Sequence, residues 1–318
     1  MWCILNRTTT NRKSGIVQLT VLIFGLICLL AVIDPPPGNP PLMAATNDLS
    51  LFTNAWRDHP VWYDDRAEFC LYESTRSVYG VTRRYQTKIY TNKEWADPHT
   101  KTKNTRPVGR EVFKHHSVEL ISTENYDYKF STMSYVGTED LKSLKIDMGS
   151  QDDCGSSFKQ FVNHAGTLIW HSFVYFPGAG HKHGAYAPPV RFVFQDSLSL
   201  ILRGYPFDSA QDVLEINLLL DQTSHRETPA EPVPARIVYL GREVLQLPIG
   251  EVATHHLRVT TTRADEIDTP THDYWFAASG EPPWLHVMVQ YKGPGSLTDR
   301  LREHRRWAYW KQSSTSQP

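Results

Sequence analysis

The residues of this sequence best suited to chemistry are histidines between positions 164 and 183. His181 and His183 alternate in a glycine-rich stretch, and His164 and His171 lie shortly before them. Alternate residues of a β-strand point to one face, so a strand here would present His181 and His183 together. Neutral imidazoles bind zinc or copper, which makes these four histidines the candidate metal site. The alternative is a glycine-rich loop whose histidines face water, since no cysteine or carboxylate stands at a ligand-like spacing.

Two cysteines lie outside the N-terminal region, Cys70 and Cys154. A nucleophilic cysteine needs a neighbouring cation or a helix N-terminus. Cys154 instead follows Asp152 and Asp153, and Gly155 after it suits a turn. We therefore expect no catalytic cysteine. Cys70 and Cys154 are a candidate disulfide, and the sequence leaves open whether they pair.

Two histidine doublets occur in strand-like stretches, His115-His116 and His255-His256. Neighbouring residues of a strand point to opposite faces, so neither doublet places both of its rings in one site. We expect surface histidines on edge strands at both positions. The sequence names no catalytic residue.

Most of the chain after position 47 is patterned as short β-strands. Runs of aromatic and β-branched residues recur at close spacing, separated by turn residues. They cover residues 67–72, 82–90, 117–122, 127–135, 144–148, 167–176, 214–220, 236–240, 257–262 and 285–291. Close spacing with hairpin-like breaks predicts an antiparallel sheet rather than βαβ units. We expect a mostly β fold, a curved antiparallel sheet or an open or half barrel with few short helices.

Helical signals are few. Residues 195–202 suit one or two helical turns, and residues 156–163 fit either a short helix or a strand. Residues 297–310 fit either a terminal helix or a last strand. Two polar stretches, 92–107 and 222–234, are expected to be loops, and the second could divide the β-rich body in two.

The N-terminal region carries the pattern of an export signal. Basic residues stand in residues 1–15, an apolar run covers 16–33, and a proline-rich stretch follows in 34–46. This is the order of a cleaved signal peptide or of an uncleaved signal anchor. The run is long for the apolar core of a cleaved signal, about 7–15 residues, and long enough for a membrane span, about 17–25. We expect attachment to the membrane through this segment, or secretion after cleavage, with the body outside the cytoplasm.

The composition indicates a folded body over residues 47–310, followed by a polar tail at 311–318. Hydrophobic residues make up 40% of the chain, enough to form a core. The formal net charge is −1, whereas a nucleic-acid-binding protein would show a basic excess. We therefore expect no nucleic-acid partner, and we expect no cofactor.

Three segments of the body resemble one protein family. They are Trp62-Tyr63-Asp64-Asp65-Arg66-Ala67-Glu68 followed by Tyr72, Tyr79-Gly80 and Arg83-Arg84, then Ser150-Gln151-Asp152-Asp153-Cys154-Gly155, then His171-Ser172-Phe173-Val174-Tyr175-Phe176 and Gly178. These segments are similar to an uncharacterised family of exported bacterial proteins, commonly predicted lipoproteins and often labelled septum formation inhibitor Maf. The chain departs from the family at Asp153, where the family has tryptophan, and it lacks a well-placed lipid-attachment cysteine. The resemblance implies an exported β-rich protein and no known reaction.

The Maf label itself does not suit the sequence. True Maf proteins are cytoplasmic nucleotide pyrophosphatases with a Ser-x-Arg-Arg element in an α/β fold. This chain has no such element at the start of a domain, and its export-type segment contradicts a cytoplasmic location.

The expected function is a non-enzymatic binding or structural module of the cell envelope, periplasmic in a Gram-negative cell. A curved sheet lined with aromatic residues can leave an apolar face open to a hydrophobic ligand, such as a lipid or an acylated envelope protein. The alternative is a metal-dependent hydrolase that uses His164, His171, His181 and His183. A plain structural role is favoured if neither a groove nor a site is present.

Overall fold

A computed structural model describes residues 48–153, 155–209, 213–225, 228–261 and 270–311 of the chain. The export-type segment and the proline-rich stretch, predicted within residues 1–46, lie outside these residues. Cys154 and residues 312–318 of the predicted tail lie outside them as well. Among the described residues, no helix combines the length and the apolar character that a membrane span requires.

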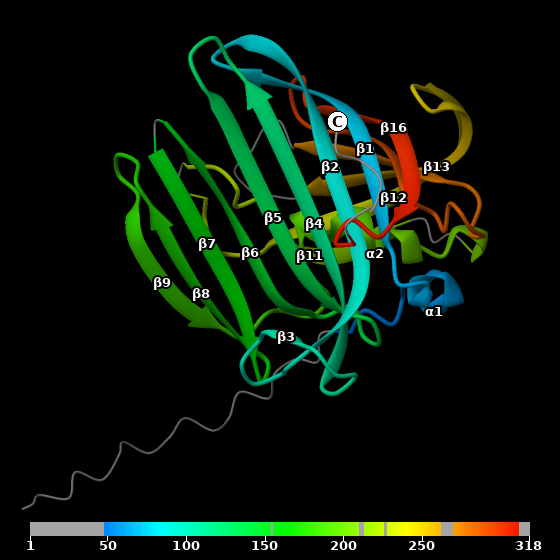
Figure 1. Ribbon diagram of the computed structural model, residues 1–318, viewed down its shortest axis with the longest axis horizontal. Helices are drawn as coiled ribbons and strands as arrows, with labels where there is room; N and C mark the ends of the chain where they lie inside the picture. The colour runs from blue at the N-terminus through cyan, green and yellow to red at the C-terminus, as the bar shows by residue number, and fades with distance from the viewer. Residues whose placement is uncertain (1–47, 154, 210–212, 226–227, 262–269, 312–318) are drawn as a thin grey trace, which may run out of the picture. The chain divides into compact units, whose positions relative to one another are not determined.

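In the described part of the chain, sixteen strands form one sheet (Figure 1). In chain order they are β1 (Ala67–Val78), β2 (Val81–Ala96), β3 (Lys103–Asn104), β4 (Arg110–Ser122), β5 (Asp127–Gly137), β6 (Ser143–Asp152), β7 (Gly155–His164), β8 (Thr167–Val174), β9 (Gly180–Tyr186), β10 (Phe192–Phe194), β11 (Leu214–Leu219), β12 (Val233–Leu247), β13 (Gly250–Thr261), β14 (Thr271–Ala277), β15 (Met288–Lys292) and β16 (Thr298–Trp307). Their order across the sheet is β10-β11-β12-β13-β14-β15-β16-β1-β2-β4-β5-β6-β7-β8-β9, with β3 paired to β2. The pair β10 and β11 is parallel, and the hairpins from β4 to β9 are antiparallel.

The sheet is curved and does not close, and β9 and β10 are its two edges. Shifts of register contribute to the curvature, for example between Leu71 and Tyr72 of β1 and between Tyr239 and Gly241 of β12. Such a bulge adds a residue to one strand, which bends the strand and increases its twist. The curvature gives the sheet an inner face and an outer face. The expected curved antiparallel sheet is confirmed.

The inner face packs on a short helical segment. Its helix α2 (Leu198–Ile201) follows the 3-10 turn η2 (Gln195–Ser197) and precedes the turn η3 (Leu202–Gly204). Leu198, Leu200 and Ile201 are buried in the main core. A second α-helix, α1 (Ala55–Asp58), carries Trp56, which stacks on Phe113 of β4 with ring centroids 5.0 Å apart. These apolar contacts pack both helices against the strands that line the main core.

Alternation along the strands decides which side chains reach the inner face. In β7, Ser157, Lys159 and Phe161 are buried, whereas Phe158 and Gln160 between them are more exposed. The same period of two continues in β8 and β9, because successive residues of a strand point to opposite faces. Each of these strands therefore supplies one row of residues to the interior and one row to the outer face.

The two segments that the sequence left open between helix and strand are both strands. Residues 156–163 lie in β7, and residues 298–307 form β16 rather than a terminal helix. The predicted helical turns at 195–202 are confirmed as η2 and α2. The loop predicted for 92–107 begins too early, because β2 continues to Ala96 through its pairing with β4. At the loop predicted for 222–234, the sheet continues on both sides, with β11 paired to β12.

The prediction of edge-strand surface histidines is wrong for both doublets. β4 and β13 are interior strands of the sheet, each with a partner on both sides. His115 and His255 are only 2% and 1% exposed, whereas His116 and His256 face the other side and are half-buried. The doublets do point to opposite faces, as expected. Their burial depends on the position of the strand within the sheet, which the local pattern does not contain.

Candidate functional site

The structure brings three of the four predicted histidines together on the outer face of β8 and β9. His171 and His183 lie directly opposite each other in the antiparallel register, and their ring centroids are 6.0 Å apart. His181 lies two positions from His183 on the same face, with ring centroids 5.7 Å apart. Phe173, the residue opposite His181, stacks on its ring at 4.3 Å. The sheet register, rather than a loop, assembles this group.

His164 lies apart from the other three. It ends β7 at the hairpin to β8, opposite Thr167, whereas the β7 residue opposite His171 is Gln160. Four residue steps along a strand correspond to about 13 Å. His164 therefore belongs to the same outer face but not to the same cluster. A metal-dependent hydrolase at these histidines stays a prediction.

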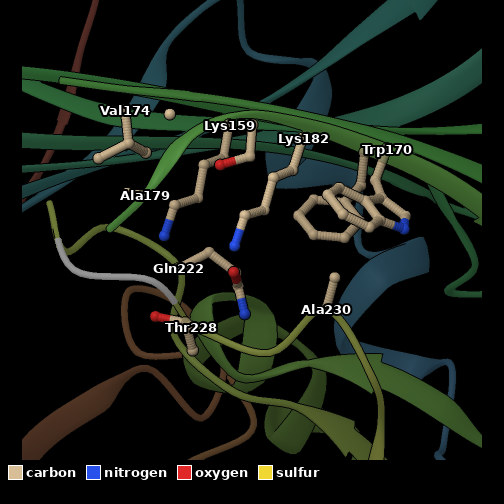
Figure 2. Close-up of a pocket in the computed structure, with 11 residues that line it drawn as sticks. Lys159, Trp170, Val174, Ala179, Lys182, Gln222, Thr228 and Ala230 are labelled. Carbon is tan, nitrogen blue, oxygen red and sulfur yellow. The ribbon is translucent and has the colours of Figure 1, made fainter. Parts of the chain in front are cut away.

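On the inner face of the same strands, two lysines converge in a cavity. Lys159 of β7 and Lys182 of β9 both point away from the sheet, toward Gln222 and Thr228, as Figure 2 shows. Lys159 is only 2% exposed. The cavity has a volume of about 50 Å³. Both side chains end at one small space, where charges interact more strongly than in water.

The rest of this cavity is largely apolar. Its wall includes Phe161, Trp170 and Val174 from the inner rows of β7 and β8, and Ala230 lies across from Trp170 (Figure 2). Phe161 also packs edge-on against Phe194 of β10, with ring centroids 5.5 Å apart. We call this space, between the inner face of β7–β9 and residues 222 and 228–230, the lysine cavity.

The chain segment that covers the lysine cavity is fixed at two points. The side-chain amide of Gln222 donates to the carbonyl oxygens of Leu220 and Pro229, at 3.1 and 3.0 Å. His225 Nε2 lies 2.8 Å from Asp152 Oδ2 at the end of β6. These polar contacts hold the segment against the sheet and satisfy its polar groups.

A second and larger pocket lies on the other side of the same segment. It has a volume of about 400 Å³, and its walls include Tyr79, Tyr128, Phe130 and Phe176. At this pocket Arg76 lies over the ring of Phe130, 5.3 Å from the centroid, and forms an ion pair with Glu119 at 3.0 Å. A concave space of this size with aromatic walls and a few polar groups is typical of ligand pockets.

Three buried carboxylates, Glu119, Asp299 and Asp196, have pKa values above their ordinary values. Burial raises the pKa of Glu119 to about 7, against the opposing effect of Arg76 and with help from Asp299 and Asp221. Burial likewise raises the pKa of Asp299, and that of Asp196 well above its ordinary value, the latter also through Asp221. Several acids near one arginine cannot all ionise at low cost in a weakly solvated interior. Perturbed pKa values of this kind mark functional sites and structural networks alike.

A third group, Glu68, Cys70 and His304, has the composition of a metal site but is already occupied by an ion pair. Its ligand atoms lie within 4.8 Å of one another. Arg203, however, donates to both oxygens of the Glu68 carboxylate, at 3.0 and 2.5 Å. Burial, followed by the charge of Glu68, raises the pKa of the Cys70 thiol far above its ordinary value, so the thiolate needed as a ligand is disfavoured. Pairing of Cys70 with Cys154 stays a prediction, because Cys154 lies outside the described residues.

The residues of the two pockets were not predicted from the sequence. Lys159 carried a usable signal, since it occupies the inward position of an alternating run between Ser157 and Phe161. A lysine in the apolar row of a strand is uncommon and marks a site worth testing. Nothing in the local sequence marks Lys182, which stands between His181 and His183. Its approach to Lys159 depends on the pairing of β7, β8 and β9.

Comparison with known proteins assigns no family. No known protein family matches the sequence, and no curated protein is similar to it. A solved structure, the beta-barrel-like protein of domain of unknown function DUF1849 from Brucella abortus, has a TM-score of 0.48 and 7% sequence identity to this chain. The similarity covers 76% of this chain and 98% of that one. Membership of the exported bacterial family stays a prediction.

Proposed function

We propose that this protein is a non-enzymatic binding module of the cell envelope that holds an anionic amphiphile in the lysine cavity. The observation that carries the proposal is the convergence of Lys159 and Lys182 beside the apolar wall formed by Phe161 and Trp170. The ligand class is a carboxylate or phosphate group joined to an apolar chain. The predicted membrane segment within residues 1–46 supports the location in the envelope.

The charged half of the ligand follows from the two lysines. Ammonium groups in a weakly solvated interior are stabilised by negative charge, and charge-assisted hydrogen bonds are the strongest that a protein makes. The cavity of about 50 Å³ has room for roughly four water-sized groups. A carboxylate or phosphate group is of that size, so the apolar chain joined to it would extend out of the cavity past Phe161 and Trp170. An anion in this position accepts hydrogen bonds from both lysines at once.

The apolar part of the proposed ligand is inferred from the aromatic wall of the lysine cavity. Phe161 and Trp170 present ring surface to the same space, and burial of apolar atoms against them contributes about 25 cal/mol per Å². The first methylene groups next to the anion would contact these rings. A sugar or another polar ligand would leave the rings without that gain.

Calorimetric titration tests the proposal with a matched pair of ligands. We expect the purified full-length protein to bind hexyl phosphate and to bind hexanol, which has the same chain without the charge, at least about tenfold more weakly. Lys182→Met should weaken the binding of hexyl phosphate by roughly tenfold to hundredfold, since a hydrogen bond to a charged group contributes about 1.5–3 kcal/mol.

Lys88→Met is the control, because Lys88 is exposed on the opposite face of the sheet in β2. It should leave the affinity for hexyl phosphate within about twofold of the wild type. Equal affinity for hexyl phosphate and hexanol, or equal losses from Lys182→Met and Lys88→Met, would show that the lysine cavity is not the binding site.

A further inference from the structure

The outer face of β8 and β9 carries a cluster of imidazoles that the lysine cavity does not use. His171, His181 and His183 project from this face, while Lys182 between the last two projects to the inner face. Because its side chain lies on the other side of the sheet, the ammonium group of Lys182 does not occupy the space among the imidazoles. The cluster is therefore independent of the proposed ligand site.

The spacing of His183 from each of the other two rings is close to what one metal ion requires. A zinc or copper ion lies about 2.0–2.1 Å from each coordinating nitrogen, which places the centroids of two imidazoles on one ion about 5–6 Å apart. The centroids of His171 and His183 are 6.0 Å apart, and those of His183 and His181 are 5.7 Å apart.

The backbone fixes these positions. His171 and His183 are directly paired across two antiparallel strands, and His181 follows at the next position on the same face. Phe173 stacks on His181 with an interplanar angle of 13° and limits the rotation of that ring. Ligands on paired strands are held more accurately than ligands on a loop, so less ordering is needed when the ion binds.

Exposure suits the cluster to metal binding. His181 and His183 are exposed and His171 is half-buried, so an ion reaches them from solvent. Three imidazoles favour divalent ions of the later transition series, and copper binds such ligands more tightly than zinc does. Neither magnesium nor calcium fits, because both prefer oxygen ligands.

We propose that His171, His181 and His183 bind one Cu²⁺ or Zn²⁺ ion, with the fourth coordination position open to water. The ion would connect β9, an edge strand of the sheet, to β8. An edge strand has hydrogen-bond partners on one side only, so an added link between its side chains and the neighbouring strand opposes its separation.

Copper titration of the full-length protein, prepared without a histidine tag, tests the proposal. We expect saturable binding of Cu²⁺ that His183→Gln weakens by more than about tenfold, since even an outer-shell partner of a metal contributes roughly 10–100-fold to affinity. Electron paramagnetic resonance of the Cu²⁺ complex should show coupling to imidazole nitrogens. His171→Gln and His181→Gln should each reduce the number of coupled nitrogens.

His164→Gln is the matched control, because His164 lies on the same outer face but at the far hairpin. It should leave the copper affinity within about twofold of the wild type. Hydrogen exchange gives a second readout: Zn²⁺ should slow exchange of the amides in β9 of the wild type but not of His183→Gln. The proposal is overturned if the His164 and His183 variants lose affinity equally, or if Zn²⁺ leaves exchange in β9 unchanged.

Discussion

Arg203 and Glu68 form a buried ion pair that joins the helical segment to the first strand of the sheet. The guanidinium donates to both carboxylate oxygens, and each side chain is only 2% exposed. The guanidinium also lies over the rings of Trp56 and Trp62, 5.7 and 5.9 Å from their centroids. Although burial opposes ionisation, Arg203 holds the pKa of Glu68 well below its ordinary value. The pair therefore ties η3 to β1 inside the main core.

Removing the charge of Glu68 should strongly destabilise the fold. Glu68→Gln leaves the guanidinium of Arg203 buried without a counter-charge, which costs about 3–5 kcal/mol of unfolding free energy. Urea unfolding of the purified protein measures this loss. Glu73→Gln is the control on the same strand, because Glu73 pairs with Arg302 where both side chains are half exposed or more. An exposed pair contributes about 0–1 kcal/mol, so equal losses from the two variants would contradict the role given to Glu68.

Glu119 should make the folded state less stable as the pH rises. Its folded-state pKa of about 7 lies above its ordinary value of 4.5, so the folded state binds this proton more tightly than the unfolded state does. Unfolding free energy therefore falls between pH 4.5 and 7 and stays low above that window. The difference from this group is up to about 3 kcal/mol. Urea unfolding at pH 5 and at pH 8 measures it.

Glu119→Gln separates this effect from that of the other buried acids. The variant keeps the size of the side chain but has no proton to release, so its stability should fall less between pH 5 and pH 8 than that of the wild type. Asp196, whose pKa burial raises well above its ordinary value, contributes to the slope that remains. A variant that keeps the full wild-type slope would show that Glu119 does not titrate in this window.

His115 should give the opposite pH dependence at acid pH. Burial lowers the pKa of His115 to about 3, from an ordinary value of 6.5. The neutral ring bonds Thr91 and Ser199 at 2.8 and 2.9 Å, linking β2 to α2. Its stabilising effect is complete above pH 6.5 and is lost as the pH falls from 6.5 toward 3.

His115→Gln tests this assignment. We expect the variant to be less stable than the wild type at pH 7, because it leaves at least one buried hydrogen-bond partner unsatisfied, at about 1–3 kcal/mol. It should also lose less stability than the wild type between pH 7 and pH 5, as measured by urea unfolding. A steeper acid loss in the variant than in the wild type would contradict the burial of a neutral His115.

Gly149 should not tolerate a side chain. It lies in β6 opposite Phe158 of β7, and an added Cβ would overlap the backbone carbonyl oxygen of Ser157. A backbone atom cannot move aside as a flexible side chain can, so Gly149→Ala should lower the melting temperature and cost roughly 1–3 kcal/mol. Ser156→Ala at the neighbouring exposed position is the control and should be nearly neutral. Equal melting temperatures for the two variants would contradict the close approach of β6 and β7.

The sequence by itself determined that this protein is built mainly of β-strands. The closely spaced runs of aromatic and β-branched residues and the turn residues between them predict an antiparallel β fold, and the spacing of His181 and His183 places both rings on one face of a strand. Those properties are local, because successive residues of a strand point to opposite sides whatever the strand pairs with. Local patterns did not settle whether residues 156–163 and 297–310 were helices or strands, and sheet pairing decided both for the strand.

Only the tertiary structure decided which distant residues meet. His171 joins His183 through the register of β8 with β9, and Lys159 reaches Lys182 across the strand between them. Burial of His115 follows from the interior position of β4, and Glu68 meets Arg203 across 135 positions of sequence. Register and strand order depend on the whole set of pairings, and a shift by one residue would exchange the two faces of a strand. For that reason the candidate sites of this protein are properties of the sheet and not of any one segment.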